Sequence, residues 1–172
     1  MEQTILQINE WIKQQLTQVD IKDFALAESV AVRSEDGEVT FPALILPNGE
    51  GINVYAETDK HDVTLYHRLN SISYQDNENV SIGSARGYTE VDDISLIVFG
   101  KRKKQNKYEL ERVIIAALSK NNHISISRSD FNALQIFASE FTGVTYFLGT
   151  EYYLFKINYS ITSTLNTRCI NK

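Results

Sequence analysis

The sequence is poor in the residues that mark several protein classes. It contains one cysteine, Cys169, and two prolines among 172 residues. A single cysteine excludes a disulfide framework, and we expect Cys169 to be an inert thiol in a polar tail. No apolar run approaches the ~18 residues that a membrane-spanning helix needs, and the first residues do not resemble a signal peptide. With 42% hydrophobic residues, the chain is instead expected to fold as one domain, residues 1–172, around one core.

Residues that support catalysis or metal binding are also few. The three histidines, His61, His67 and His123, are not spaced to share one helix face, and one cysteine cannot form a thiolate site. The chain has no Gly-x-Ser-x-Gly motif for a nucleophilic serine. Acidic pairs such as Glu35 and Asp36 lie in a turn, where carboxylates are normally solvated. We therefore expect no catalytic residues, no metal, no cofactor and no enzymatic activity.

What the chain does contain is a charge that changes sign along its length. Residues 1–100 include 6 Lys and Arg against 17 Asp and Glu, a net charge of −11. Residues 101–172 include 11 against 5, a net charge of +6, which leaves −5 for the whole chain. An acidic protein is not expected to wrap nucleic acid with its whole surface. The split in charge indicates instead two regions that attract unlike partners.

Two stretches have the periodicity of amphipathic helices. Apolar residues recur at steps of three and four early in the chain, which predicts a helix over roughly residues 4–19. A second apolar face, from Leu110 to Leu118, predicts another helix, and residues 132–140 are expected to form a short helix or turn. Trp11 lies beside the stripe of the first helix, so it either widens the buried face or contacts another element or subunit.

A β-hairpin is predicted between the two helices. Residues 29–34 and 39–46 are rich in strand-forming residues, and they flank the Asp36-Gly37 pair that is typical of a hairpin turn. Pro42 lies within the second of these strands. Because proline cannot donate a hydrogen bond to the ladder, we expect Pro42 on an edge strand or at a bulge.

The rest of the chain predicts further strands and one long loop. Four segments have alternating or continuous apolar residues and are predicted as strands: 64–75, 94–99, 123–128 and 152–165. The first of them is irregular near Asn70, which indicates a bulge, and 94–99 is expected to be a central strand buried on both faces. Residues 76–93 are acidic and poor in large aliphatics, so we expect a long loop there. The predicted fold is α+β, a mostly antiparallel sheet of about five to six strands with two main helices packed on one face.

Two segments of opposite charge flank the expected central strand. Before it lie four acidic residues, Glu78, Glu90, Asp92 and Asp93, and after it lie five basic ones, Lys101, Arg102, Lys103, Lys104 and Lys107. The basic density attracts phosphates or an acidic protein surface, although charge runs often simply remain solvated. If the two segments are in contact, they pair either within one subunit or between neighbouring copies.

The order of these elements and their apolar patterns resemble those of a known family. An amphipathic first helix, a hairpin, a long loop, the strand 93–100 (DISLIVFG), the helix 108–118 (YELERVIIAAL) and the late alternating strand 152–161 together resemble the tail terminator and tail-completion (neck ring) proteins of tailed bacteriophages. This resemblance implies a non-enzymatic α+β protein that forms a ring, commonly a hexamer, at the tail or neck. Such a ring ends the tail tube or joins it to the head connector.

The resemblance and the charge pattern together define the functional expectations. We expect a structural protein of the phage virion, located at the tail or neck and present in the host cytoplasm during assembly, with its own copies and other tail or neck proteins as partners. A ring uses unlike patches on adjacent copies, which the acidic and basic segments provide. Membrane association and direct nucleic-acid binding are not expected. The alternative is a small binding module that uses residues 101–107 to bind nucleic acid or an acidic partner.

Overall fold

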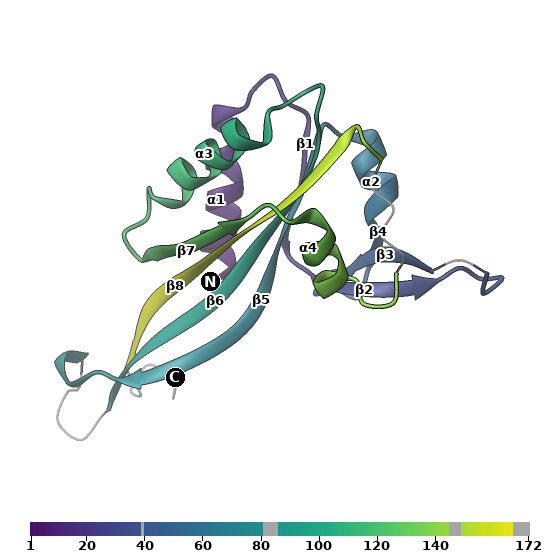
Figure 1. Ribbon diagram of the computed structural model, residues 1–172. Helices are drawn as coiled ribbons and strands as arrows, with labels where there is room; N and C mark the ends of the chain where they lie inside the picture. Colours follow the sequence, from purple (N-terminus) through teal and green to yellow (C-terminus); the bar gives the residue numbers. More distant parts are fainter. Residues whose placement is uncertain (39, 81–85, 145–148, 167–172) are drawn as a thin grey trace.

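The structure, a computed structural model, describes residues 1–38, 40–80, 86–144 and 149–166 (Figure 1). Cys169 lies outside the described residues. The elements follow one another in this order: α1 (Glu2–Gln15), β1 (Ile21–Leu26), β2 (Glu28–Arg33), β3 (Thr40–Ile45), β4 (Gly51–Asn53), α2 (Val54–Lys60), β5 (Val63–Asp76), η1 (Glu78–Val80), β6 (Gly87–Lys101), α3 (Lys107–Leu118), β7 (Ile124–Asp130), α4 (Ala133–Glu140) and β8 (Tyr152–Asn166).

The main sheet has five strands in the order β1-β5-β6-β8-β7. The edge strand β1 runs parallel to β5, and the other neighbours are antiparallel. The prediction of an α+β fold with a mostly antiparallel sheet is therefore confirmed. The strand predicted at 94–99 belongs to β6 in the middle of this sheet, and both faces of this segment are buried, as expected of a continuous apolar run.

Helices α1 and α3 cover one face of the main sheet, as predicted. Ile5, Ile8 and Ile12 of α1 are fully buried against it, together with Leu110 and Ile114 of α3. The sheet contributes side chains at every second position, because successive residues of a strand point to opposite faces. These positions on the helix side include Leu65, Leu96, Val98, Phe155, Ile157 and Tyr159.

On the opposite face, the described elements cover one end of the sheet. There α2, α4 and a second, three-stranded antiparallel sheet in the order β2-β3-β4 pack against side chains such as Tyr66, Ile97, Phe99 and Leu154. The hairpin β2–β3 was predicted, and its turn contains Gly37 with a φ of 73°. Strand β3 lies in the centre of the small sheet, not at an edge. Pro42 is nevertheless accommodated, because β4 pairs only with residues 43–45 and leaves one side of Pro42 without a ladder.

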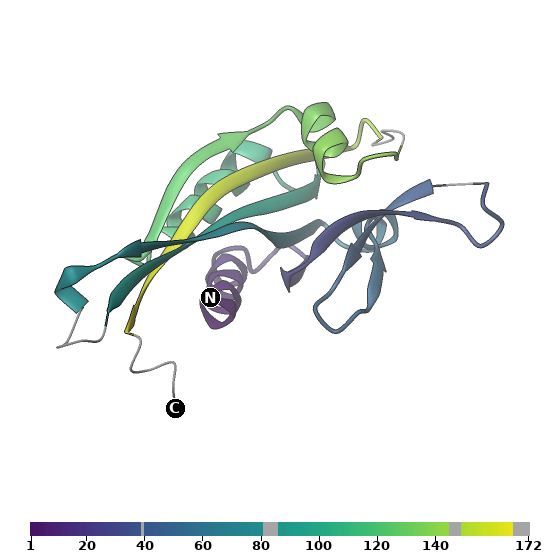
Figure 2. The same cartoon turned by 90° about the horizontal axis from the view of Figure 1, so that it is seen from below.

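Strands β5, β6 and β8 extend beyond the helices as a protruding arm (Figures 1 and 2). We call residues 70–80, 86–93 and 161–166 the arm. The strands have 14, 15 and 15 residues, more than twice the usual length, and their pairing continues to Asp76 and Asn166. The arm projects from one end of the molecule, and the β2–β3 hairpin projects from the other (Figure 2).

The structure corrects several boundaries. The loop expected at 76–93 is shorter, because residues 87–93 belong to β6; residues 81–85 are not among those described. Helix α1 ends at Gln15 rather than near residue 19. The bulge expected near Asn70 is present as a register shift between Leu69 and Ser71. Strands β1 and β4 and helix α2 were not predicted.

Candidate interaction surfaces

The four predicted acidic residues lie on the arm, but they do not form one cluster. Glu78 lies in η1 beyond the end of β5, and Glu90, Asp92 and Asp93 lie on β6. Because side chains alternate along a strand, Glu90 and Asp92 lie on the helix side and Asp93 lies on the other face. The exposed Asp93 accepts a hydrogen bond of 3.0 Å from Ser71 Oγ.

Asp92 differs from the other three because it is buried. It is 2% exposed at the junction of arm and body, and its Oδ1 has no hydrogen-bond partner among the described residues. Burial raises the pKa of the Asp92 carboxyl, and the nearby charge of Glu90 raises it further. Asp92 is thus a desolvated carboxylate and not part of an open acidic surface.

Two apolar side chains are exposed beside these acids. Ile72 pairs across the ladder with Asp92, and Tyr74 pairs with Glu90, so both lie on the helix side of the arm. They are 44% and 59% exposed. A hydrogen bond to Glu90 is the main reason that the pKa of the Tyr74 hydroxyl is raised. The helix side of the arm therefore combines apolar contact area with negative charge.

The basic residues of the turn between β6 and α3 are largely engaged by neighbouring groups. Lys101 Nζ donates to the Asp59 carbonyl at 2.8 Å, and Arg102 Nε donates to the Tyr152 carbonyl at 2.9 Å. Lys104 lies 3.8 Å from Asp62 Oδ1, and Lys107 Nζ lies over the ring of Tyr108. Lys103 is exposed and has no ion pair or hydrogen bond within the part of the chain described here. We call residues 101–107 the basic turn.

A hollow of about 240 Å³ lies beside the basic turn, at the start of α3. It is lined by Arg102, Gln105, Asn106, Lys107, Tyr108 and Tyr153. Tyr153 is 3% exposed, and its hydroxyl has no hydrogen-bond partner among the described residues. Burial raises the pKa of this hydroxyl, and the charge of Arg102 offsets part of the increase. This hollow could not be predicted from the sequence, because Tyr153 lies about fifty residues from the basic turn.

Gly100 is required for this arrangement. A Cβ atom at position 100 would lie 2.3 Å from Tyr153 Cζ, so any larger residue would displace the ring. Glycine at this position lets β8 place Tyr153 flat against β6, next to the basic turn.

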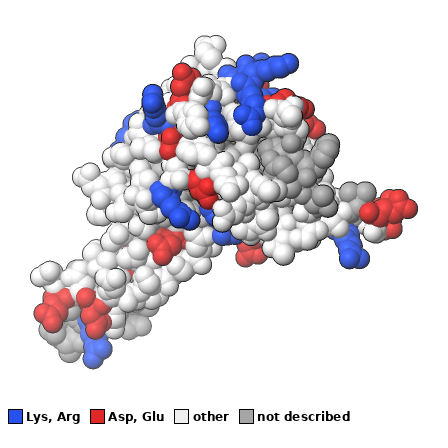
Figure 3. All heavy atoms as spheres, viewed as in Figure 1, with Lys and Arg blue, Asp and Glu red and all other residues white. Residues whose placement is uncertain are grey.

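The acidic and basic segments lie at opposite ends of the same strand. Asp93 and Lys101 are eight residues apart on β6, which corresponds to roughly 26 Å at the usual rise per residue, and Glu90 and Glu78 lie farther out on the arm. Pairing of these segments within one subunit is therefore excluded by the length of β6. Acidic residues are visible at the end of the arm, and basic residues gather at the far end of the body (Figure 3).

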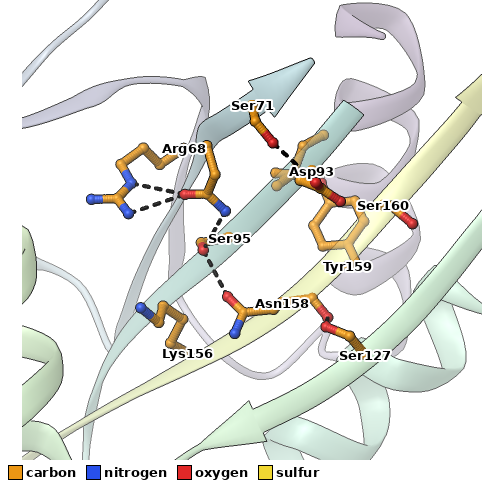
Figure 4. A pocket seen from close by; sticks show the side chains of 11 residues that line it. Arg68, Ser71, Asp93, Ser95, Ser127, Lys156, Asn158, Tyr159 and Ser160 are labelled. Carbon is orange, nitrogen blue, oxygen red and sulfur yellow. Dashed lines mark hydrogen bonds between the residues drawn. The ribbon is translucent and has the colours of Figure 1, made fainter. Parts of the chain in front are cut away.

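A polar groove of about 480 Å³ occupies the uncovered part of the main sheet (Figure 4). Hydrogen bonds link its side chains across three strands: Asn70 Nδ2 donates to Ser95 Oγ at 3.0 Å, and Ser95 Oγ donates to Asn158 Oδ1 at 2.7 Å. Lys156, Asn158 and Ser160 of β8 line this groove. In this structure much of its hydrogen-bonding capacity is used within the sheet.

A buried carboxylate lies next to this groove. Glu140 of α4 is 2.7 Å from Arg68 Nη1 and 3.5 Å from Lys156 Nζ, and it accepts a hydrogen bond of 3.0 Å from Ser29 Oγ. The Tyr66 hydroxyl is hydrogen-bonded to the same serine. Burial, with the charge of Glu140, raises the pKa of that hydroxyl. This cluster connects α4, β5 and β8 to the small sheet through β2, which gives it a structural role.

Trp11 lies in the body rather than on the arm or the basic turn. It is partly buried against the core, and Lys120 Nζ lies 5.4 Å from its ring centroid. Trp11 therefore widens the buried face of α1, which was one of the two interpretations of the sequence.

Other kinds of site find little support in the part of the chain that the structure describes. No group of three or more His, Cys, Asp or Glu side chains lies close enough there to hold a metal ion. None of the described helices is long and apolar enough to span a membrane. No protein-family model matches the chain, and no curated protein matches its sequence. The two charged ends of β6 are therefore the features on which a functional proposal depends.

Proposed function

We propose that this protein is a non-enzymatic structural protein of a tailed-phage virion. It assembles as a ring, with six copies favoured, at the tail or neck, and the ring ends the tail tube or joins it to the head connector. The phage assignment depends on the resemblance in element order described above. The proposal of self-assembly depends on one observation, which is that the acidic arm and the basic turn lie at opposite ends of β6.

Opposite charges at opposite ends favour contacts between copies over contacts within one copy. A patch that complements a different patch on the next copy forms a heterologous contact, and such contacts close into rings when the rotation between copies allows it. Complementary charge would increase the rate of encounter and fix the register of the subunits. The exposed Ile72 and Tyr74 add apolar area to the acidic side of that contact.

Negative-stain microscopy and light scattering of the pure protein test the proposal. The expected result is a ring of uniform diameter with about six times the subunit mass of 19.6 kDa. Assembly is expected to weaken as salt rises, because exposed charges are screened. A protein that stays monomeric at concentrations up to about 100 μM at low salt would contradict ring formation.

The alternative, a small binding module, is favoured by the exposure of Arg102, Lys103 and Lys104 at the basic turn. If these residues bind nucleic acid, purified protein retards duplex DNA, and the logarithm of the affinity falls linearly with the logarithm of the salt concentration. A ring former of the proposed kind shows no such retardation. One gel-shift titration therefore separates the two functions.

A further inference from the structure

The hollow beside the basic turn combines several features of an anion-binding site. Arg102 and Lys107 line it, and it lies at the first turn of the 12-residue helix α3, where the helix dipole favours negative charge. An independent feature is the hydroxyl of Tyr153, which is buried and has no hydrogen-bond partner among the described residues. An acceptor that entered the hollow would be held by the positive charge of Arg102 and Lys107, and Tyr153, whose hydroxyl has no described partner, forms part of the wall.

We propose that this hollow is a carboxylate-binding site that receives an acidic side chain from the arm of a second copy of the chain. This inference rests on the proposed function, because a head-to-tail ring is what brings an arm to the basic turn of the next copy. It names the contact that holds the ring together.

The composition of the arm matches this role. Among its described residues are five carboxylates, Asp76, Glu78, Glu90, Asp92 and Asp93, and one cation, Arg86. Glu78 and Glu90 lie farther from the body than Asp92 and are not buried, so they can reach another molecule. Exposed apolar residues are found on both sides of the proposed contact. Ile72 and Tyr74 lie on the arm, and Tyr108, which is 52% exposed, lies at the rim of the hollow.

The surroundings of the hollow favour a single carboxylate over a nucleic-acid backbone. Asp62 lies beside Lys104, and Asp59 accepts a hydrogen bond of 2.6 Å from the Tyr152 hydroxyl. These acids would repel a chain of phosphates that runs along the basic turn. A hollow of about 240 Å³ has room for one acidic side chain between Arg102 and Lys107.

Reversal of charge on each side separately tests the contact. The variant R102E/K103E reverses the charge of two residues of the basic turn, and the variant E78K/E90K reverses the charge of two residues of the arm. We expect each to lower the ring population at least about tenfold in sedimentation velocity, because each juxtaposes like charges. The combined variant E78K/E90K/R102E/K103E restores opposite charges and is expected to assemble again. R112E changes the charge of an exposed residue on α3 outside the hollow and is the control; it should assemble like the wild type.

The variant Y153F tests the hollow itself without a change of charge. It removes a hydroxyl that has no hydrogen-bond partner among the described residues, so the melting temperature of the separated subunit should stay the same or rise. Association should weaken measurably, because the hydroxyl would bond the incoming carboxylate. If Y153F assembles as tightly as the wild type, the hollow is not the binding site.

The possible outcomes separate failure of this inference from failure of the proposed function. If wild-type protein forms rings and R102E/K103E still does, the contact lies elsewhere and the ring proposal stands. If both charge-reversed variants fold but form no ring, and the combined variant also forms no ring, the proposed pairing is overturned. If wild-type protein forms no ring, both proposals are overturned. Retardation of duplex DNA that R102E/K103E abolishes would identify the hollow as a phosphate site and would overturn the inference.

Discussion

The long strands β5, β6 and β8 pass through two regions that differ in what covers them. In the body their helix-side residues lie beneath α1 and α3, and Leu65, Leu96 and Phe155 are fully buried. In the arm the same ladder continues, yet Ile72 and Tyr74 remain exposed. Backbone pairing is present in both regions, whereas side-chain burial is concentrated in the body. We infer that the body stabilises the subunit and that the arm is available for contacts with a partner.

The largest expected effect is the loss of a core aromatic in the body. Phe155→Ala removes a ring whose centroid lies 5.5 Å from that of Phe131 and 6.1 Å from that of Tyr153. We expect the free energy of unfolding to fall by about 4 kcal/mol. The matched change in the arm, Ile72→Ala, should stay within about 0.5 kcal/mol, because Ile72 is already exposed. Urea unfolding of the separated subunit measures both. If Phe155→Ala and Ile72→Ala lowered the free energy of unfolding equally, the contrast between body and arm would be contradicted.

A slightly smaller effect is expected at the buried carboxylate, where the main sheet meets α4 and the small sheet. Glu140→Gln leaves the positive charges of Arg68 and Lys156 without their counter-charge. Removal of one partner from a buried ion pair lowers the free energy of unfolding by about 3 kcal/mol. Glu109→Gln on the exposed surface of α3 is the control and should change little. Thermal unfolding at pH 7 distinguishes the two. If Glu140→Gln melts like the wild type, the cluster does not hold the small sheet to the body.

The body is also expected to be acid-sensitive through His67. This side chain is buried and hydrogen-bonded to Asn9 at 2.8 Å and Tyr159 at 2.7 Å, and burial lowers its pKa to about 3. An unfolded histidine takes up a proton near pH 6.5, so the unfolded chain binds more protons than the folded one between about pH 6.5 and 3. Stability from this source is therefore present above pH 6.5 and is lost as pH falls, by up to about 1.4 kcal/mol per unit.

The contribution of His67 can be isolated by comparing how steeply the free energy of unfolding changes with pH in different variants. Between pH 7 and 5, His67→Gln should flatten the fall in the free energy of unfolding, although its absolute stability is lower because two hydrogen bonds are changed. His123→Gln alters an exposed histidine and should keep the slope of the wild type. If the two variants have the same slope, His67 does not titrate in the proposed way.

The elements of the body could be predicted because burial leaves a period in the sequence. Ile157 and Ile161 alternate with Asn158 and Ser160 on β8, and the isoleucines of α1 recur at helical spacing, so both the elements and their faces were predicted. Among the described elements no helix covers the outer part of the arm, where Ile72 and Tyr74 are exposed, and residues 87–93 have little apolar alternation. Because apolar alternation is the pattern that predicts a strand, this segment was predicted as a loop. Pairing with β5 and β8 is what makes the segment a strand.

The features that were missed depend on residues distant in sequence. Ser29, Arg68, Glu140 and Lys156 meet in one buried cluster, and no local pattern marks any of them as partners. Tyr153 reaches the basic turn only because Gly100 leaves room for its ring. The charged segments themselves were found from composition, but their separation along β6 could not be, because it requires the length and pairing of that strand.

The smallest expected effect lies at the boundary between the two regions. Burial raises the pKa of Asp92, so the folded state binds its proton more readily than the unfolded state. Above its folded pKa, the charged carboxylate therefore opposes folding, and Asp92→Asn should raise the free energy of unfolding at pH 7 by about 0.5 to 1 kcal/mol. The gain should disappear as pH falls through the folded pKa, where Asp92 becomes neutral. Asp93→Asn, on the exposed face one residue later, should show no gain in the same urea titrations. If Asp92→Asn destabilises the subunit, the carboxylate has a partner that it needs, and the buried body extends into the arm beyond Ile94.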